Sequence, residues 1–307
     1  MSYIYEALLK AEHERKNPPP VESEQPHAAT MVEAVPPPPV EERHAAALSV
    51  AQFVWHPFLP SFPTLTKHGR GLEQFRSLRS HIYQARNENP VKTLLVSSGM
   101  PAEGKSFVAA NLAVSLARNS ANKILLIDAD LRRPSLHSLL GTPNDRGLSD
   151  YLAGTCPLRE VMQQCDLSNQ PEGAGELELA NLTFIPTGAP VEHASELIAN
   201  LKIKDLVAEA SATFDWILID SPPVLVFSDA VDLARAVDSV LLVVRGSQTT
   251  YEIAQRAQSS FANSHILGVV LNDIKNPPRR DSYYNYYYYD KRKGSEQPVT
   301  GEAQEKE

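Results

Sequence analysis

A glycine-bracketed stretch at residues 99–106, GMPAEGKS, constrains this chain more than any other feature. It matches the pattern G-x-x-x-x-G-K-[ST] and lies between an apolar run and a helical repeat, the usual context of a phosphate-binding loop. Glycines let backbone N–H groups turn inward around a phosphate, and the start of the helix adds positive potential. The loop therefore predicts an ATP site. The residues expected to bind the nucleotide are Gly99, Glu103, Gly104, Lys105, Ser106 and Phe107.

Two apolar runs elsewhere in the chain end in aspartate. Residues 217–219 lead into Asp220, the form in which an aspartate supports Mg²⁺ beside a phosphate loop. Residues 125–127 lead into Asp128 and, two positions on, Asp130. Because ligands bind beyond the carboxyl ends of strands in open α/β sheets, one aspartate of this pair is expected to accept a proton from a hydroxyl and the other to orient the metal. An isolated pair of this spacing also occurs at solvated strand ends, and the phosphate loop favours the functional interpretation.

Short β-branched runs alternate with amphipathic stretches from about residue 72 onward, which predicts a parallel sheet covered by helices on both faces. We therefore expect the α/β fold of a P-loop NTPase. The predicted strands are Thr93–Ser97, Ile124–Asp128, Leu182–Pro186, Trp216–Asp220, Val240–Arg245 and Ile266–Leu271. The predicted helices are Leu72–Ala85, Lys105–Arg118, Ala194–Ala210, Asp229–Val237 and Tyr251–Asn263.

The remaining segments suggest extensions around this domain. Residues 1–16 can form a short helix, which is either a frayed end or a docking helix, and residues 17–71 are proline-rich, typical of a disordered linker. The domain is expected to cover residues 72–276, with an irregular insertion at 163–180. Residues 277–307 form a tail outside the α/β pattern.

Composition excludes several function classes. The net charge of −8 argues against a general nucleic-acid binder. Cys156 and Cys165 are too isolated for a metal site and are expected to be reduced thiols. No apolar run approaches the roughly 20 residues of a membrane helix. We therefore expect a soluble, cytoplasmic protein without a membrane span of its own, for which any membrane role needs a partner.

The tail contains six of the 11 tyrosines of the chain within seven positions: Tyr283, Tyr284, Tyr286, Tyr287, Tyr288 and Tyr289. Basic residues flank the cluster on both sides. Such a tail can bind a partner or stack on single-stranded nucleic acid. Beside a site able to transfer phosphate, its phenolic hydroxyls are better interpreted as phosphoacceptors.

Taken together, these motifs make residues 72–290 resemble the bacterial tyrosine kinases of the CpsD/CapB type, relatives of the MinD and ParA ATPases. Residues 127–134, IDADLRRP, are similar to the family's Walker A′ segment, and residues 220–223, DSPP, to its Walker B motif. Residues 195–197 match a recurrent SEL segment. Glu73, Arg76 and Arg79 match an ExxRxxR element that mediates subunit contacts in ring-shaped oligomers.

The resemblance implies autophosphorylation in trans, in which the tail of one subunit enters the active site of a neighbour. It also implies a homo-oligomer, which can take the form of a ring, and activation by a separate membrane protein of the polysaccharide co-polymerase type. That partner would recruit the chain to the inner face of the cell membrane. The phosphorylation cycle of such kinases controls the synthesis and export of capsule or exopolysaccharide.

The resemblance and the motifs together assign roles to single residues. ATP and Mg²⁺ are the expected cofactors: Lys105 holds the phosphates, while Ser106, Asp128 and Asp220 serve the metal. Asp128 is the first choice of base for the tyrosine hydroxyl and Asp130 orients it, although the two roles can be exchanged. Arg133 is expected to stabilise charge on the transferred phosphoryl group. Asn272 is expected either to bind the adenine base or to be an ordinary turn residue.

Two residues depart from the family pattern. Ala102 replaces a glycine, which restricts the loop if that position needs a positive φ. Phe107 stands in place of a common threonine and removes a hydroxyl near the α-phosphate. Both substitutions bear on nucleotide affinity.

Two other functions remain compatible with the motifs. One is a MinD/ParA-like ATPase switch without kinase activity. That group usually carries an extra lysine early in the loop, and residues 97–100 here are SSGM, so its absence and the tyrosine tail favour a kinase. The other is a catalytically weak binding module whose tyrosines only bind partners.

Overall fold

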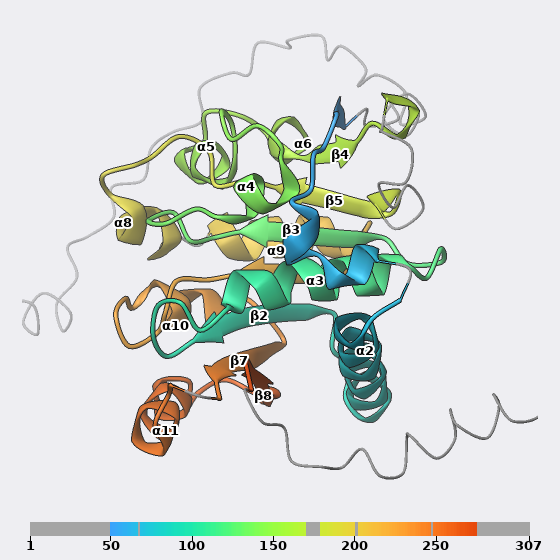
Figure 1. The fold of residues 1–307 in the computed structure, drawn as a ribbon. Helices are drawn as coiled ribbons and strands as arrows, with labels where there is room; N and C mark the ends of the chain where they lie inside the picture. The colour runs from blue at the N-terminus through green and yellow to red at the C-terminus, as the bar shows by residue number, and fades with distance from the viewer. Residues whose placement is uncertain (1–49, 67, 170–178, 200–201, 247, 275–307) are drawn as a thin grey trace, which may run out of the picture. The chain divides into compact units, whose positions relative to one another are not determined.

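The computed structural model describes residues 50–66, 68–169, 179–199, 202–246 and 248–274. They form one eight-stranded sheet with helices on both faces (Figure 1). Its strand order is β1-β4-β5-β3-β6-β2-β7-β8. The strands are β1 (Ala51–Phe53), β2 (Thr93–Ser98), β3 (Ile124–Asp128), β4 (Gln163–Cys165), β5 (Leu182–Ile185), β6 (Trp216–Asp220), β7 (Ser239–Arg245) and β8 (Ile266–Asn272).

Six strands, from β5 to β8 in the order of the sheet, run parallel, and they are the six strands that the sequence predicts. Their carboxyl ends therefore lie at one edge of the sheet, where Asp128 and Asp220 are register partners. β4 runs antiparallel to β5, and β1 pairs with β4. The predicted P-loop NTPase fold is confirmed.

Alternate residues of the central strands face two separate cores. One core packs Leu94, Leu126 and Leu218 against α2 (Arg70–Glu88) and α3 (Lys105–Ala117). The other core lies on the opposite face of the sheet, where Leu95, Leu125 and Ile217 pack. Burial on both faces explains why these strands are almost continuously apolar. The helices that contribute to the second core include α5 (Leu148–Ala153), α6 (Leu158–Val161), α8 (Ala194–Ala199), α9 (Lys202–Ser211), α10 (Asp229–Ala234) and α11 (Tyr251–Ser260).

The predicted linker is wrong for its last part, because residues 50–66 belong to the packed fold. This stretch contains β1 and two short 3₁₀ turns, Leu59–Ser61 and Pro63–Leu65. Trp55 and Phe62 within it are fully buried. Apolar anchors of this size offset the ordering entropy that a proline-rich composition otherwise leaves uncompensated.

A buried asparagine of α3 fastens this stretch to that helix. Asn111 Oδ1 accepts a hydrogen bond from Thr64 Oγ1 at 2.7 Å, and its Nδ2 donates to Ser61 O at 2.8 Å. The same Nδ2 lies 2.9 Å from Phe107 O. The polar atoms of a buried side chain need such partners. The hydrogen bonds therefore fix residues 61–64 against the helix that begins at the phosphate loop.

The insertion predicted as irregular at residues 163–180 also begins with regular structure, since it contains β4. Its residues 170–178 lie outside the described residues, as do the predicted helix 1–16 and the tail 277–307. Within the described part of the chain, no helix is both long and apolar enough to cross a membrane.

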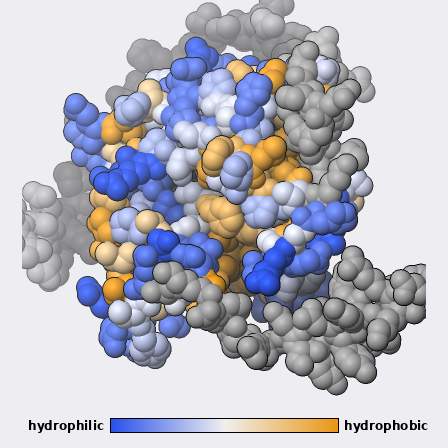
Figure 2. All heavy atoms as spheres, in the orientation of Figure 1, coloured by the Kyte–Doolittle hydropathy of each residue, from blue (hydrophilic) through white to orange (hydrophobic). Residues whose placement is uncertain are grey.

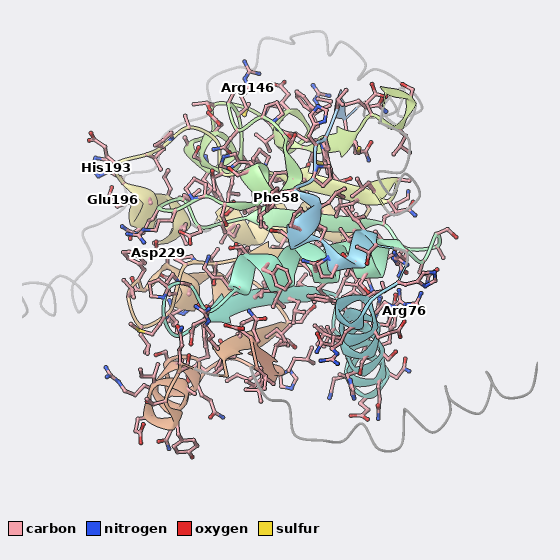
Figure 3. The ribbon with its side chains drawn as sticks, viewed as in Figure 1. Phe58, Arg76, Arg146, His193, Glu196 and Asp229 are labelled. Atoms are coloured by element: carbon pink, nitrogen blue, oxygen red, sulfur yellow. The ribbon has the colours of Figure 1, made fainter. Side chains whose placement is uncertain are left out.

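Apolar side chains gather at the centre of the face seen in Figure 2. Phe58, labelled in the same view in Figure 3, is 58% exposed, and Leu59 is 52% exposed. Phe58 N donates to Leu139 O of α4 (Leu136–Leu140) at 3.0 Å. Phe58 and Leu59 thus lie beside α4 and do not line the pocket at the phosphate loop.

Candidate active site

The phosphate loop connects β2 to α3 and turns at Gly104, which has a φ of 91°. Only glycine adopts this left-handed conformation without strain. A β-carbon on Gly104 would lie 2.0 Å from Asn272 Nδ2, so space and backbone conformation both require glycine. Because α3 begins at the next residue, its N-terminal N–H groups face the position expected for a bound phosphate.

Glu103 braces the loop from within. Its Oε2 accepts the Met100 backbone N–H at 2.7 Å, and its Oε1 accepts the hydroxyl of Thr249. Asn272 Nδ2 donates to Glu103 O at 3.0 Å. The buried carboxylate of Glu103 is thus occupied by hydrogen bonds that shape the loop. Its side chain supports the loop and does not line the pocket above it.

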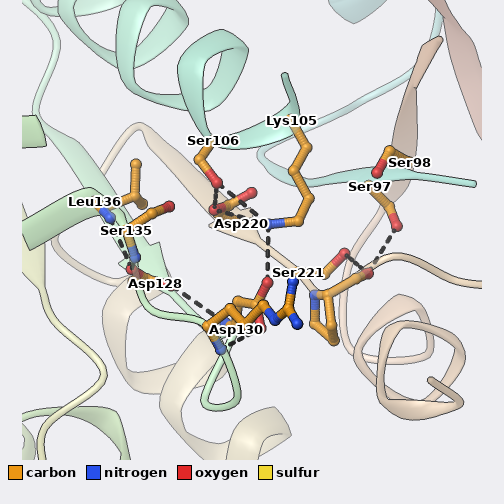
Figure 4. Close-up of polar contacts among 12 residues, drawn as sticks. Ser97, Ser98, Lys105, Ser106, Asp128, Asp130, Ser135, Leu136, Asp220 and Ser221 are labelled. Carbon is orange, nitrogen blue, oxygen red and sulfur yellow. Dashed lines mark hydrogen bonds and ion pairs between the residues drawn. The ribbon is translucent and has the colours of Figure 1, made fainter. Parts of the chain in front are cut away.

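Lys105 lies at the centre of a polar cluster built from three elements (Figure 4). Its Nζ lies 2.9 Å from Asp130 Oδ2, 3.6 Å from Asp220 Oδ2 and 3.2 Å from Ser106 Oγ. Ser106 Oγ donates to Asp220 Oδ2 at 2.5 Å. Four of the residues singled out from separate sequence motifs thus meet beyond the carboxyl ends of β2, β3 and β6.

Asp128 is fully buried below this cluster. Its Oδ2 accepts the backbone N–H groups of Ser135 and Leu136 at 3.1 and 3.0 Å, and its Oδ1 accepts that of Asp130 at 3.2 Å. Asp130 Oδ1 in turn accepts the backbone N–H of Arg133. Asp128 therefore shapes the segment after β3, whereas Asp130 presents a carboxylate oxygen to Lys105.

The cluster contains more negative than positive charge. Burial, followed by the charge of Asp220, raises the pKa of Asp128 to about 7. Burial raises the pKa of Asp220 to about 6, although Lys105 and Ser106 oppose that change. Burial by itself lowers the pKa of Lys105, but the charges of Asp220 and Asp130 outweigh it and the net pKa is raised. Three buried carboxylates beside one lysine therefore favour a further cation.

One atom of this cluster matches the requirements of a metal site. Asp220 Oδ1 is buried and has no hydrogen-bond partner among the described residues, a condition that is rare for a carboxylate oxygen. Oxygen ligands from carboxylates and hydroxyls are those that Mg²⁺ prefers, usually together with waters and substrate phosphates. The carboxylate of Asp220 and the hydroxyl of Ser106 fit such an ion.

A pocket of about 360 Å³ opens above Lys105 and Ser106. Asp130 and Arg133 line it, whereas Asp128 does not. Its other walls combine loop residues with the segment that follows β6. Pro101 and Pro223 lie within the phosphate-loop and DSPP motifs, whereas Ser135, Val226 and Phe227 lie outside every motif of the sequence. No motif marks the last three, since each reaches the pocket only through the fold of its own segment.

The two residues that depart from the family pattern have structural consequences. Ala102 has a φ of 62°, so its position does require the left-handed conformation that glycine favours. The Phe107 ring packs edge-on against Phe75 of α2, with centroids 5.8 Å apart. Compared with the threonine common in the family, Phe107 lacks a hydroxyl but adds an aromatic contact between α2 and α3.

The three charged residues predicted to contact another subunit behave differently from one another. Glu73 Oε1 and Arg76 Nη1 form an ion pair of 2.9 Å, with about half of each side chain or more exposed. Figure 3 shows Arg76 on the outer side of α2. Arg79 Nη1 instead donates to Ser115 O of α3 at 2.6 Å, so this side chain fastens α2 to the domain.

Comparison with known proteins agrees with the fold. Residues 89–296 match the ParA family, described as NUBPL iron-transfer P-loop NTPase. The chain is 33% identical over 217 residues to tyrosine-protein kinase YwqD of Bacillus subtilis, covering 70% of this chain and 85% of that protein. It is 36% identical over 219 residues to tyrosine-protein kinase etk of Escherichia coli K12, covering 70% of this chain and 28% of that protein.

A solved structure points to the same group. The kinase domain of the Escherichia coli tyrosine kinase ETK superposes with a TM-score of 0.63 at 28% sequence identity, covering 78% of this chain and 93% of that domain. The parallel sheet and the phosphate loop define a P-loop NTPase of the ParA and MinD class. Within that class, the chain belongs to the bacterial tyrosine-protein kinases, as the sequence motifs indicated.

Proposed function

We propose that this kinase transfers the γ-phosphoryl group of ATP to the tyrosine cluster at residues 283–289 of a neighbouring copy of itself. The observation that carries the proposal is the cluster of Lys105, Ser106, Asp130 and Asp220 at the floor of an open pocket. It combines a phosphate-binding lysine, two oxygen ligands for Mg²⁺ and a carboxylate within reach of an acceptor. The six tyrosines supply acceptors in the same chain.

The residues of the loop have distinct parts in this transfer. The N–H groups at the start of α3 and the ammonium of Lys105 hold the phosphates. Ser106 and Asp220 would ligate Mg²⁺, which neutralises charge on the phosphate oxygens when it is bound. Lys105 exchanges its contact with Asp130 for the phosphates. Arg133, at the rim of the same pocket, is placed to stabilise charge on the transferred group.

The contacts favour Asp130 as the base, although the sequence put Asp128 first. All three backbone N–H groups that Asp128 accepts would have to be given up for it to reach a substrate. Asp130 lines the pocket, and its Oδ2 can turn to a substrate once Lys105 has moved away, while its Oδ1 keeps the backbone N–H of Arg133. In the reaction, the phenol proton passes to Asp130 and the phenol oxygen bonds to the γ-phosphorus. The bond from that phosphorus to the bridging oxygen breaks, and ADP leaves.

A second cavity of about 540 Å³ adjoins the loop and supports a place for the nucleoside. Phe107 and Asn272 both line it, which supports the roles toward the nucleotide that we propose for them. The volume falls in the range typical of small-molecule sites. The Asn272 side-chain oxygen remains available as an acceptor, since its Nδ2 already donates to the loop.

Transfer in trans has a physical rationale in charge. Each phosphate adds about −1.5 to −2 charges at pH 7, so a phosphorylated tail is repelled by a site that already holds three carboxylates. We propose that exposed Glu73 and Arg76 contribute to contacts between copies in an oligomer. A membrane protein of the polysaccharide co-polymerase type is the proposed activator and would recruit the kinase to the inner face of the membrane. Capsule or exopolysaccharide export is the proposed process.

Incubation of the purified full chain with ATP and Mg²⁺, followed by mapping of phosphotyrosine, tests this function. Label is expected on residues 283–289, increased by the cytoplasmic segment of the membrane partner. Lys105→Met should abolish it, and label that survives this change would come from a contaminating kinase. ATP hydrolysis without any tyrosine label under either condition would favour an ATPase switch instead.

A further inference from the structure

An apolar wall faces the most polar part of the chain. Pro223, Val226 and Phe227, from the loop between β6 and α10, line the same 360 Å³ pocket as Lys105 and Asp130. Val226 is 45% exposed, although it is a large apolar side chain. Phosphates and Mg²⁺ gain nothing from an apolar surface, because their partners are N–H groups, cations and oxygen ligands. The wall therefore indicates that this pocket also binds an apolar ligand group.

Phe227 is held in place by a guanidinium. Arg132 Cζ lies 4.3 Å from the centroid of the Phe227 ring, within the range of a cation–π contact. Arg132 Nε donates to Asp229 Oδ2 at 3.0 Å, and its Nη2 donates to Ser195 Oγ at 2.5 Å. Ser195 Oγ closes the triangle by donating to Asp229 Oδ1 at 2.7 Å.

This triangle joins three segments that are far apart in the sequence. Arg132 follows β3, Ser195 lies in α8, and the buried Asp229 begins α10. Figure 3 labels Asp229 in the region of these helices. A planar arginine with two fixed partners loses little further freedom when it covers a ring. The orientation of the Phe227 ring is therefore set before any ligand arrives.

We propose that Pro223, Val226 and Phe227 form a subsite for the aromatic ring of the acceptor tyrosine, with Arg132, Asp229 and Ser195 as positioning residues. This inference rests on the proposed function. Aromatic rings gain from offset or edge-to-face contacts in addition to the burial of their area. A tyrosine ring on this wall places its hydroxyl over the polar floor of the pocket.

The depth of the floor explains why such a subsite selects tyrosine. Asp130 is only 3% exposed and Lys105 is largely buried, so an acceptor hydroxyl has to reach below the rim of the pocket. The hydroxyl of tyrosine stands at the end of a long, rigid ring that fits between apolar walls. Serine carries its hydroxyl next to the backbone, and its backbone would have to enter the pocket. The wall therefore gives both reach and specificity.

Binding of a fluorescent peptide with the sequence of residues 281–290 tests the subsite independently of catalysis. The full chain, saturated with ADP and Mg²⁺, is titrated with this peptide and with a version in which serine replaces every tyrosine. The chain should bind the tyrosine peptide and not the serine peptide. Phe227→Ala should weaken binding about tenfold, the amount that loss of an aromatic pair and its burial produces. Phe227→Tyr should restore it.

Kinetics with the same peptide separate this role from a structural one. Phe227→Ala and the positioning variant Asp229→Asn should raise KM for the peptide while the affinity for ADP, measured directly, stays unchanged. Phe58→Ala is the matched control, because Phe58 is an exposed phenylalanine outside the pocket, and it should leave both constants unchanged. Thermal unfolding of each variant shows that it is folded.

Several outcomes would overturn the subsite. Equal binding of the tyrosine and serine peptides, or unchanged peptide affinity in Phe227→Ala, would show that the apolar wall does not bind the tyrosine ring. A parallel loss of ADP affinity in Phe227→Ala would assign the wall to the nucleotide. If the wild-type chain binds the tyrosine peptide through Phe227 but transfers no phosphate to it, the subsite stands and the proposed kinase reaction on this tail fails.

Discussion

The amide nitrogen of Asn272 lies 2.0 Å from the point that a β-carbon on Gly104 would occupy. The last strand of the sheet and the turn of the phosphate loop are therefore in direct contact, although 168 positions separate the two residues. The hydrogen bond from Asn272 Nδ2 to Glu103 O, at 3.0 Å, makes this contact favourable.

Gly104→Ala should disrupt this contact in two ways, through the left-handed φ and through the clash. We expect a loss of about 2–4 kcal/mol in the free energy of unfolding and loss of nucleotide binding. Urea unfolding and titration with a fluorescent ADP analogue measure both. The double variant Gly104→Ala/Asn272→Ala should recover the part of the loss caused by the clash. Additive losses in the double variant would show that the two residues do not interact.

Ala102→Gly should stabilise the chain. An alanine with a φ of 62° is strained by about 1–2 kcal/mol. Glycine removes this strain, but its greater conformational freedom in the unfolded chain offsets part of the gain. We expect a net gain of about 0.5–1 kcal/mol and tighter ADP binding, because the loop reaches its shape more easily. Ala121→Gly is the matched control: Ala121 is exposed and does not have a positive φ, so glycine should destabilise there.

Trp55→Ala and Phe62→Ala should each lower the free energy of unfolding by about 3–5 kcal/mol, since both side chains are fully buried. Phe58→Ala, three positions from Trp55 and 58% exposed, should cost far less. Denaturant unfolding of the full chain measures the difference. If the three variants were equally stable, residues 50–66 would act as a linker after all.

Arg76→Ala and Arg79→Ala should separate assembly from stability. Arg79 donates to Ser115 O, so its loss should destabilise the chain by about 1–3 kcal/mol. Arg76 forms an exposed ion pair with Glu73, and its loss should leave stability nearly unchanged while it reduces the size of any oligomer. Unfolding and analytical ultracentrifugation give the two measurements. A stable, fully assembled Arg76→Ala variant would remove this arginine from the interface.

Asp220→Asn should remove the dependence of nucleotide binding on Mg²⁺. The asparagine oxygen can still accept from Ser106 Oγ, but the buried negative charge is lost. We expect ADP affinity to become the same in Mg²⁺ and in a chelator, whereas the wild-type chain should bind more tightly with the metal. A variant that keeps the full response to Mg²⁺ would place the ion elsewhere.

Apolar runs buried on both faces give a strong sequence signal, and for that reason the six parallel strands and the carboxylates at their ends were predictable. β1 and β4 have only three residues each, and the letters AQF and QQC show no such pattern. The two buried aromatic residues of the 50–66 stretch are masked by the prolines around them. α4, α5 and α6 have four to six residues each, too few for a helical repeat.

Much of the site depends on pairings that no local pattern reveals. Glu103 is supported by Thr249, 146 positions away, and Arg132 meets Asp229 at a separation of 97. The motifs indicated that Asp128 and Asp130 belong to the site, but not which one faces the pocket. That distinction arises from the backbone of residues 133–136, which encloses Asp128.

The ion pair between Lys105 and Asp130 implies an order of events. While the two residues form this pair at 2.9 Å, neither is free for the task that the proposed mechanism gives it. A phosphate that draws the ammonium away leaves the carboxylate oxygen free to meet the acceptor hydroxyl. In the proposed mechanism, nucleotide binding thus frees the base. A tyrosine that enters before the nucleotide meets a base that is still paired with Lys105. Initial-rate kinetics should accordingly show compulsory order, with ATP as the leading substrate.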